Sequence, residues 1–238
     1  MPIFGLKIPG PVICLLAISL LSGCASMTPS PTPGESLAGD YQRMLLESEG
    51  ELIEPSDSTL KAHWRGQPNA GDLRKHYARR KDFHQRCELN RPDGEFAQAM
   101  EDGRPGAAGE LMRDWLESCP VDAQGHLYAA LAYEEAGLGI ASRLHMDWFL
   151  EITDRALATG DGRSADTAFE TISIQESHAL LLRLGLHGVE RELIRDGQLI
   201  DRVIAEDSSG QRHTLYFHPR WHFIRLHARV AAQQAESP

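Results

Sequence analysis

The sequence predicts an α+β protein, with helical hairpins in its first part and a small antiparallel sheet with one short helix in its last part. Apolar residues recur at helical spacing between residues 39 and 158. Between residues 159 and 219 the pattern changes to short alternating runs separated by turn residues, which is typical of strands. Of the 238 residues, 42% are hydrophobic and 24% are charged, so the chain can bury a core and is not disordered as a whole.

The first 23 residues have the features of a removable export signal. Lys7 supplies a positive charge, and the apolar run at residues 12–21 is too short to cross about 30 Å of hydrocarbon. The run ends in Leu21-Ser22-Gly23-Cys24, which resembles the lipobox of bacterial lipoproteins. The resemblance implies cleavage before Cys24 and attachment of a diacylglycerol to its thiol. An ordinary membrane segment with a buried cysteine is the alternative.

The residues around the expected anchor indicate where the mature protein lies. Several acyl chains on one cysteine hold a protein stably on a membrane, because each buried CH₂ contributes ~0.8 kcal/mol. Ala25 follows Cys24, where an aspartate is the familiar inner-membrane retention signal, so we expect the outer membrane, with the body on its periplasmic face. Residues 24–38 include a proline-rich stretch and are expected to form a linker between the lipid and the folded body.

The helical part, residues 39–158, contains an internal repeat. Residues 106–116 and 139–149 align at an offset of 33, with Gly, Ala, Leu, Asp and Trp in the same places. The period and the alternation of small and large residues resemble the tetratricopeptide repeat, in which pairs of helices stack on their neighbours. The resemblance implies a short helical array. It either presents a concave surface to a peptide or protein partner or forms only a packed core.

The sequence also gives signals for the ends of individual helices in this part. Between the two copies, a helix is predicted over residues 123–136, with Asp122 placed to cap its start and Gly137 to end it. The second copy is predicted to continue as a helix over residues 140–158, up to a cluster of turn residues. Short connections of this kind favour neighbouring antiparallel helices.

Three large side chains on the repeat are predicted to be buried. Trp115 and Trp148 occupy equivalent places on the apolar stripes of the two copies, so we expect both in the core. His145 takes the stripe position that Met112 holds in the first copy. This position predicts a buried, hydrogen-bonded histidine rather than a catalytic group.

Before the repeat, residues 72–83 form a basic cluster in an acidic chain. Leu73, Tyr77 and Arg80 are predicted to share one face of a helix, with bases over the rest. The bases could contact acidic residues of the repeat region, anionic lipid headgroups or an acidic partner, or could form a solvated helix face. The acidic residues in question are Glu95, Glu101, Asp102, Glu110, Asp114 and Glu117.

Two cysteines remain in the expected mature chain beside the lipidated one. Cys14 leaves with the signal, so Cys87 and Cys119 form an even pair. In an oxidising compartment such a pair is a candidate disulfide, and two buried thiols are the alternative. Neither cysteine belongs to a C-x-x-C motif, so nothing supports a thioredoxin-like redox role.

The last part of the chain reads as a sheet with one helix. The predicted elements are a strand at 169–174, a helix at 175–186, and strands at 190–195, 198–206 and 212–217. Asp196-Gly197 lies between two of these strands and is a strong signal for a tight hairpin. Residues 220–238, after Pro219, are treated as a C-terminal tail, with no predicted secondary structure.

A run of residues in this part resembles the signature of a bacterial family. The matching residues are Gly160-Asp161-Gly162-Arg163-Ser164, Thr167-Ala168-Phe169, Ile172-Ser173, Glu176 and Ala179-Leu180-Leu181. Together with Leu73-Arg74, the Asp196-Gly197 hairpin and Leu215-Tyr216-Phe217, they resemble domain of unknown function family 4919. The resemblance implies an exported bacterial protein and carries no established activity. Such proteins have two acids and a tyrosine in the short helix, where this chain has Gln175-Glu176-Ser177-His178.

The glycine-rich segment at residues 160–165 is a candidate polar site. It matches G-x-G-x-x-A, but it follows a predicted helix and precedes a predicted strand, the reverse of a dinucleotide site. Asp161 and Ser164 can bond neighbouring backbone amides, which favours a structural turn. The alternative is a small catalytic site in which Asp161 and Ser164 join His178.

The sequence predicts no cofactor and no metal site. Histidines gather near the C-terminus, but neither H-E-x-x-H nor C-x-x-C spacing accompanies them. The histidines concerned are His213, His218, His222 and His227. The formal charge of −10 also argues against nucleic-acid binding, which requires a basic surface.

Taken together, these features predict a non-enzymatic envelope lipoprotein whose body binds a protein partner in the periplasm. A hydrolase that acts on envelope material is the alternative, with Asp161, Ser164 and His178 as its polar residues. The two hypotheses make different demands on the fold. The enzyme needs a pocket in which those three side chains converge, whereas the binding protein needs an exposed groove or apolar patch.

Overall fold

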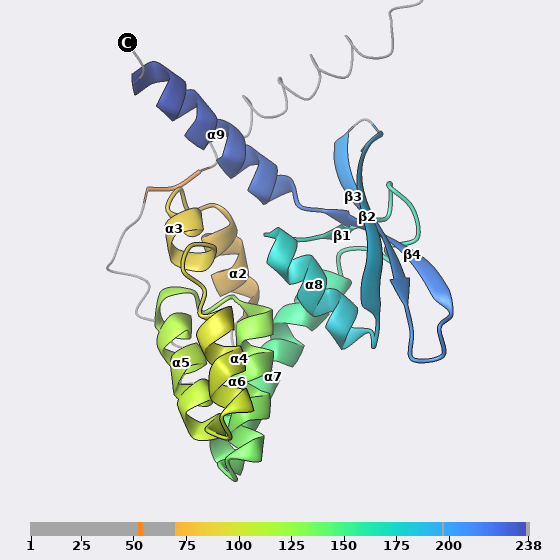
Figure 1. Ribbon diagram of the computed structural model, residues 1–238. Helices are drawn as coiled ribbons and strands as arrows, with labels where there is room; N and C mark the ends of the chain where they lie inside the picture. Colours follow the sequence, from red (N-terminus) through yellow and green to blue (C-terminus); the bar gives the residue numbers. More distant parts are fainter. Residues whose placement is uncertain (1–51, 55–69, 197, 237–238) are drawn as a thin grey trace, which may run out of the picture. The chain divides into compact units, whose positions relative to one another are not determined.

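The computed structural model describes residues 52–54, 70–196 and 198–236, all within one compact unit that spans residues 33–238. The predictions for the export signal, Cys24 and the linker at 24–38 fall outside the described residues. The described chain forms eight helices and a four-stranded sheet, which confirms the α+β class (Figure 1). Among these helices, none combines the length and the apolar character needed to cross a membrane.

Six helices form the first part of the described chain. They are α2 (Ala70–Ala78), α3 (Phe83–Cys87), α4 (Asp93–Glu101), α5 (Pro105–Ser118), α6 (Ala123–Glu135) and α7 (Gly139–Leu157). Consecutive helices from α4 to α7 pack on one another. Gly109 permits the close approach of α5 to α6, because a Cβ atom there would lie 2.7 Å from the ring of Tyr133.

The end signals predicted for the central helix are confirmed. The Asp122 carboxylate accepts a hydrogen bond from the backbone N–H of Gly125 at 2.9 Å and so caps α6. Gly137 follows α6 with φ of +73°, a conformation that favours glycine and ends the helix. Asp122 has a second role, because its Oδ2 accepts a hydrogen bond from Trp115 Nε1 at 2.8 Å.

The three large side chains of the repeat are buried as predicted. Trp115 and Trp148 both belong to the core. His145 is 2% exposed, and its Nδ1 lies 3.0 Å from Nδ1 of His126. Nε2 of His126 donates to the carbonyl of Pro120 at 3.1 Å, so its Nδ1 is free to accept from His145.

The prediction that Arg80 shares a helix face with Leu73 and Tyr77 is wrong, because α2 ends at Ala78. After α2 the backbone at Arg80 forms a parallel β-bridge with Ile53, and this bridge replaces helical hydrogen bonds. The bases also have partners other than the acidic residues of the repeat region. Arg74 pairs with Glu176, Arg80 with Asp82 and Lys81 with Glu54. Much of this basic cluster is therefore engaged within the fold.

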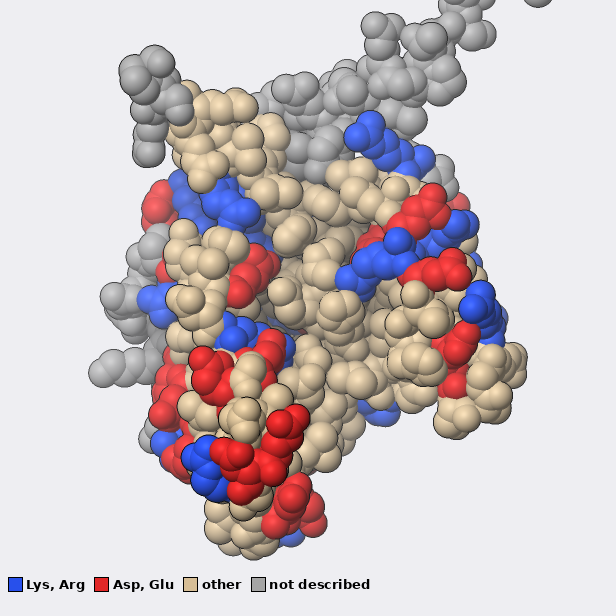
Figure 2. All heavy atoms as spheres, viewed as in Figure 1, with Lys and Arg blue, Asp and Glu red and all other residues tan. Residues whose placement is uncertain are grey.

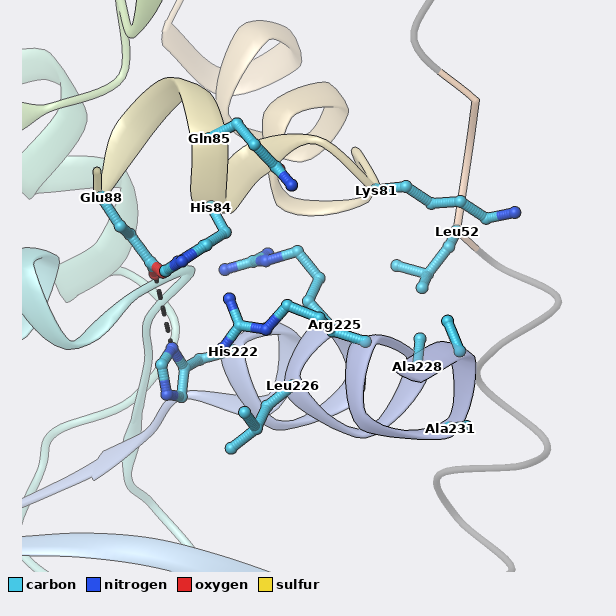
Figure 3. A pocket seen from close by; sticks show the side chains of 12 residues that line it. Leu52, Lys81, His84, Gln85, Glu88, His222, Arg225, Leu226, Ala228 and Ala231 are labelled. Atoms are coloured by element: carbon cyan, nitrogen blue, oxygen red, sulfur yellow. Dashed lines mark hydrogen bonds and ion pairs between the residues drawn. The ribbon is translucent and has the colours of Figure 1, made fainter. Parts of the chain in front are cut away.

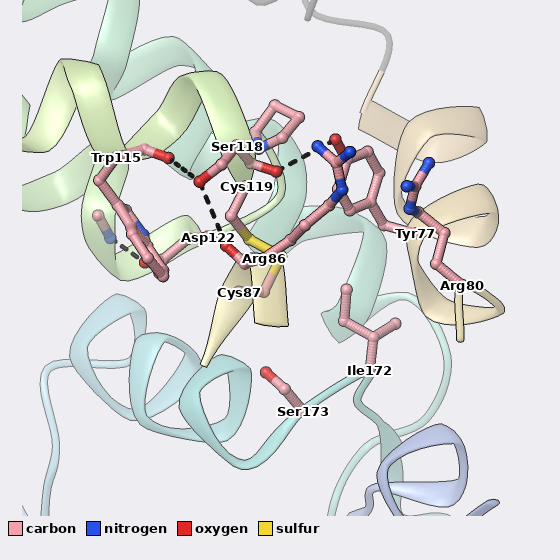
Figure 4. Close-up of a disulfide and its surroundings, with 12 residues drawn as sticks. Tyr77, Arg80, Arg86, Cys87, Trp115, Ser118, Cys119, Asp122, Ile172 and Ser173 are labelled. Carbon is pink, nitrogen blue, oxygen red and sulfur yellow. Dashed lines mark hydrogen bonds between the residues drawn. A yellow bond between two sulfur atoms is a disulfide. The ribbon is translucent and has the colours of Figure 1, made fainter. Parts of the chain in front are cut away.

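Of the two alternatives for the cysteine pair, the structure has the bond: Cys87 and Cys119 form a disulfide (Figure 4). It joins the end of α3 to the residue after α5, 32 positions later in the chain. Both cysteines lie in a core cluster with Tyr77 and Ile172. Next to the bond, Ser118 receives a hydrogen bond at its carbonyl from the hydroxyl of Tyr77, at 3.3 Å. The disulfide therefore fixes the short helices α2 and α3 against the helical repeat.

The sheet has the strand order β1-β4-β3-β2. Its strands are β1 (Phe169–Glu170), β2 (His187–Asp196), β3 (Gln198–Glu206) and β4 (Arg212–His218). The three longer strands form the predicted antiparallel meander, with Asp196 opposite Gln198 at the predicted hairpin. The prediction of a purely antiparallel sheet is wrong, because β1 pairs with β4 in parallel, Phe169 opposite Phe217.

The strand predicted at residues 169–174 contains only two strand residues, because a helix begins sooner than expected. Helix α8 spans Ile174–Arg183, and Ser173 caps it by accepting a hydrogen bond from the N–H of Glu176 at 3.1 Å. Ser173 and Glu176 have the spacing of a capping box, a helix-start signal that outweighs the apolar alternation of the preceding residues. Figure 1 shows α8 between the helices and the sheet, in contact with α6, α7 and β2.

Residues 220–236, left without predicted structure, form helix α9 (Arg220–Glu236). The prediction of a tail after Pro219 is wrong, because this proline lies immediately before the first turn, where a proline costs no hydrogen bond. Arg225 ties α9 to the rest of the fold. Its guanidinium donates to the carbonyls of Ala78 and Ile172 and lies 3.9 Å from the centre of the Phe83 ring.

Candidate functional site

The glycine-rich segment is a compact turn whose polar groups bond one another. Asp161 Oδ1 accepts hydrogen bonds from the Thr167 hydroxyl at 2.5 Å and from the N–H of Arg163 at 3.0 Å. These two hydrogen bonds, that of Thr167 above all, lower the pKa of Asp161. The Ser164 hydroxyl lies 3.0 Å from the Thr167 hydroxyl and accepts from its N–H. The segment has the geometry of the structural turn that the sequence favoured.

The glycines of this turn are required by its close contacts. A Cβ at Gly160 would lie 2.3 Å from the Thr167 carbonyl oxygen, and one at Gly162 would lie 2.2 Å from the ring of Phe169. Gly162 also has φ of +66°, and its carbonyl accepts from the N–H of Tyr216 at 2.9 Å. The turn is therefore fastened to β4, and its packing requires both glycines.

The structure does not bring His178 to this turn. His178 lies on α8 and lines a separate groove. The hydrogen bonds of Asp161 and Ser164 instead go to Arg163 and Thr167 within the turn. Partial desolvation in that groove, and then the charge of Arg191, lower the pKa of His178. The hydrolase hypothesis required the three side chains to converge, so it gains no support from this arrangement.

The groove that contains His178 is the best candidate for a functional site. It has a volume of about 470 Å³ and lies between α6, α8 and strand β2. In Figure 2, mostly acidic side chains cover the lower part of the helical region, and mixed charges cover the sheet at the right. The surface between these two regions is mostly uncharged. The lining residues include Gln124, Leu127, Tyr128, Leu131, His178, Leu182, Val189 and Arg191.

The walls of the groove are apolar side chains that the fold leaves open. Leu131 on α6 is 50% exposed, Leu182 on α8 is 43% exposed and Val189 on β2 is 44% exposed. Each helix buries its other side: Ala129 and Ala130 on α6 are fully buried, and so are Ala179 and Leu180 on α8. Three apolar side chains from three elements around one concave surface differ from a scattered surface leucine and indicate a binding site.

One side of the groove carries a polar cluster built on β2 and β3. Arg191 Nε lies 3.2 Å from Asp201 Oδ2, and Arg191 donates to the Ser177 hydroxyl at 2.8 Å. Asp201 is only 3% exposed, and burial raises its pKa, although the charge of Arg191 works in the opposite direction. Arg191 is therefore held at the groove by a buried acid, with its side chain one-third exposed.

A second polar cluster lies in a cavity of about 390 Å³ between α3 and α9 (Figure 3). Glu88 Oε2 lies 2.7 Å from His84 Nδ1, and Glu88 Oε1 lies 3.5 Å from His222 Nδ1. Burial alone would raise the pKa of Glu88, but its contacts with His222 and His84 lower it to about 2. Because Glu88 joins residues of α3 and α9, its role in the fold is to fasten the last helix.

The histidines near the C-terminus do not gather at one point. His213 on β4 lies 3.2 Å from Asp207, whereas His222 on α9 faces Glu88. Within the described ranges, no group of three or more histidine, cysteine, aspartate or glutamate side chains is arranged to hold a metal ion.

The groove was missed in the sequence, although one signal was present. Leu182 directly follows Leu180 and Leu181, which are buried, so this stretch of α8 is apolar over more than one face. A helix that is apolar beyond its buried stripe is a reason to expect a second contact surface. The exposure of Leu131 and Val189, by contrast, depends on tertiary packing and has no local signal.

No family model, curated protein or solved structure matches this chain. The functional argument therefore rests on the geometry of the groove and on the chemistry of the chain itself.

Proposed function

We propose that this protein is a non-enzymatic lipoprotein of the bacterial envelope, anchored by Cys24 in the outer membrane, whose body binds a protein partner in the periplasm. The observation that carries the binding role is the groove between α6, α8 and β2. Its apolar walls are exposed on three elements, and its polar residues lie at one side. A concave apolar surface with a few polar groups suits recognition of another chain.

The disulfide supports the proposed compartment. Bonds such as Cys87–Cys119 persist in oxidising compartments, including the bacterial periplasm, and are rare in the cytosol. The proposed export signal and lipobox at the N-terminus independently predict the same compartment. Acylation of Cys24 would then tether the folded body to the membrane through the linker at residues 24–38.

The helical part supports the finer proposal of a tetratricopeptide-like scaffold. Helices α5, α6 and α7 pack in succession, and the repeat in the sequence spans them. Apolar side chains are also exposed where α6 leads into α7: Leu138 in the connection is 49% exposed, and Ile140 in the first turn of α7 is 81% exposed. We propose that these helices present α6 to the groove and hold it rigidly, as neighbouring repeats do in binding arrays.

Site-specific photo-crosslinking in living cells tests the binding role. A photo-reactive residue replaces Leu182 in the full chain, and a matched one replaces Ser209, which is exposed on the turn between β3 and β4. We expect one defined crosslinked protein from position 182 and none from position 209. Equal crosslinking at both positions, or none at position 182, would contradict the proposed groove.

Metabolic labelling tests the anchor separately. We expect labelled palmitate to enter the full chain and to be absent from the Cys24→Ala variant, which should also keep its signal peptide. A Cys14→Ala variant, altered within the apolar run, is the matched control and should be labelled normally. An unlabelled wild-type chain with its leader still attached would overturn the anchor but not the groove.

A further inference from the structure

Strand β2 borders the groove and has a strand on one side only. In the part of the chain that the structure describes, β2 pairs with β3, and the order β1-β4-β3-β2 leaves its other side without a strand. The edge is ten residues long and offers a row of backbone N–H and C=O groups. Leu193, near its middle, is 52% exposed. Long edges of this kind accept an added strand from another chain.

The side of β2 that faces the helices carries two arginines, of which Arg191 is paired with the buried Asp201. Arg191 lies opposite Val203 and Leu193 opposite Asp201 on β3, and both β3 residues are buried. Arg195 follows on the same side, is exposed and forms no ion pair with any other described residue. A strand added beside β2 would therefore meet a cation, an apolar side chain and a second cation at alternate positions.

The opposite side of β2 is already neutralised. Glu192 pairs with Arg202 on β3, and Glu190 lies 3.4 Å from Arg212 on β4. The third residue on this side, Ile194, is uncharged and partly buried. Charge recognition of an added strand therefore falls to the helix-facing side, and above all to Arg195.

A second copy of this chain fits the edge poorly. A two-fold axis perpendicular to a sheet pairs residues that are an even number of positions apart, because opposed side chains must lie on the same face. With the axis at Arg191, Glu190 opposes Glu192, and with the axis at Leu193, Arg191 opposes Arg195. Axes at Glu190 or Glu192 oppose that glutamate to itself. Like charges directly opposite each other destabilise a pair of strands, so charge disfavours self-pairing centred on residues 190–193, the middle of the edge.

We propose that the partner adds an extended segment to the edge of β2, and that this segment has the pattern acid–x–apolar–x–acid. This proposal rests on the proposed binding function. The two acids face Arg191 and Arg195, and the apolar residue between them packs on Leu193. Neighbouring apolar residues of the same segment enter the groove over Val189 and Leu182. The pattern reads the same in both directions, so the charges fit a parallel or an antiparallel strand.

Peptide titration with the full chain in detergent tests this recognition. The probe contains Glu-Thr-Val-Thr-Glu, and its control contains Lys-Thr-Val-Thr-Lys within the same flanking residues. We expect the acidic peptide to bind about ten-fold more tightly at low salt and this preference to shrink as salt is added. The variant Arg195→Glu should weaken the acidic peptide about five-fold and strengthen the lysine peptide. Arg163→Glu, an exposed arginine on the Gly160 turn, makes the same charge change and should leave both affinities unaltered.

Hydrogen exchange distinguishes strand addition from loose charge attraction. When the acidic peptide is bound, we expect amide exchange to slow within residues 190–195 of β2. Equal binding of the two peptides, no binding of either, or protection confined to other elements would overturn the strand addition. If crosslinking at Leu182 still gives a defined partner in that case, the groove function stands and only the mode of binding fails.

Discussion

Two regions of the molecule, the groove and the buried junction where Arg74 meets Glu176 and Arg225 binds the backbone of Ile172, differ in which kind of side chain they bury. At the junction, the charged side chains of Arg74, Glu176 and Arg225 are buried between the helices and the sheet. In the groove, the apolar side chains of Leu131 and Leu182 are exposed. The buried charges all have partners that hold elements together, whereas the exposed apolar side chains have none to cover them within the described fold. In this protein, burial of charge therefore marks architecture, and exposure of apolar surface marks the candidate site.

The largest test of this contrast removes the buried ion pair. Arg74 bonds both carboxylate oxygens of Glu176, at 2.7 and 3.0 Å, and Glu176 also accepts from the N–H of Ile172. In Glu176→Gln the buried guanidinium loses its counter-charge, so we expect the free energy of unfolding to fall by about 3–5 kcal/mol. Urea denaturation measures this change. Asp154→Asn removes the exposed pair with Arg183 and should cost less than about 1 kcal/mol. Equal losses in the two variants would break the contrast.

The disulfide gives the next largest effect on the interior. The bond closes a loop between residues 32 positions apart, and a loop of this length restricts the unfolded chain by about 3–4 kcal/mol. We expect the variant with both Cys87→Ala and Cys119→Ala to lose about that much stability in urea. The reduced wild-type protein should match the variant, and a reducing agent should leave the variant itself unchanged. A wild-type protein that is indifferent to reduction would contradict a stabilising bond.

The buried histidine pair should make the interior sensitive to acid. Burial, and then the neighbouring charge of His145, lower the pKa of His126; burial and then Arg113 lower that of His145. A histidine with a lowered folded-state pKa takes up protons first in the unfolded chain. Its contribution is therefore complete above about pH 6.5 and is lost as the pH falls toward the folded-state pKa. We expect each of the two histidines to lower the free energy of unfolding by about 1 kcal/mol per pH unit below pH 6.5.

A variant of the same pair provides the control for this pH profile. His126→Gln can keep a hydrogen bond to the Pro120 carbonyl without gaining a proton. We expect its urea stability to depend less on pH between 6.5 and 5 than that of the wild-type protein. An unchanged slope would assign the acid sensitivity to other groups. Glu88 is separated from the histidines by its pH range, because its contribution to stability is lost only between about pH 4.5 and its pKa of about 2.

The parts of the fold that could be predicted are those set by neighbouring residues. Asp122 as a cap, Gly137 as a helix end and the hairpin at Asp196 each depend on local backbone chemistry. Where two local signals compete, the prediction failed: the capping signal of Ser173 outweighed the strand pattern before it. Pro219 was misread for a related reason, because a proline stops a helix interior but is tolerated at a helix start.

The candidate site was less predictable, because it is defined by distant residues. Arg74 of the basic cluster pairs with Glu176, which is 102 positions away in the chain. The residues around each of them therefore could not reveal that both are structural. Asp161 and Ser164 were correctly expected near each other, but the position of His178 depends on how α8 packs. The exposure of groove residues such as Leu131 depends on how α6, α8 and β2 pack around the groove, which is a property of the tertiary structure.

The smallest expected change in stability is also the sharpest test of the groove. Leu182 is exposed, so replacing it by serine removes few interior contacts, and we expect the free energy of unfolding to change by less than about 0.5 kcal/mol. The neighbouring Leu180 is fully buried, and Leu180→Ala should cost about 2–5 kcal/mol. With the photo-reactive residue placed at Leu131, which lines the same groove, Leu182→Ser should lose the crosslinked partner, because an apolar contact of the groove is gone. If Leu182→Ser destabilises the fold as much as Leu180→Ala, Leu182 belongs to the core, and the groove loses its main apolar wall.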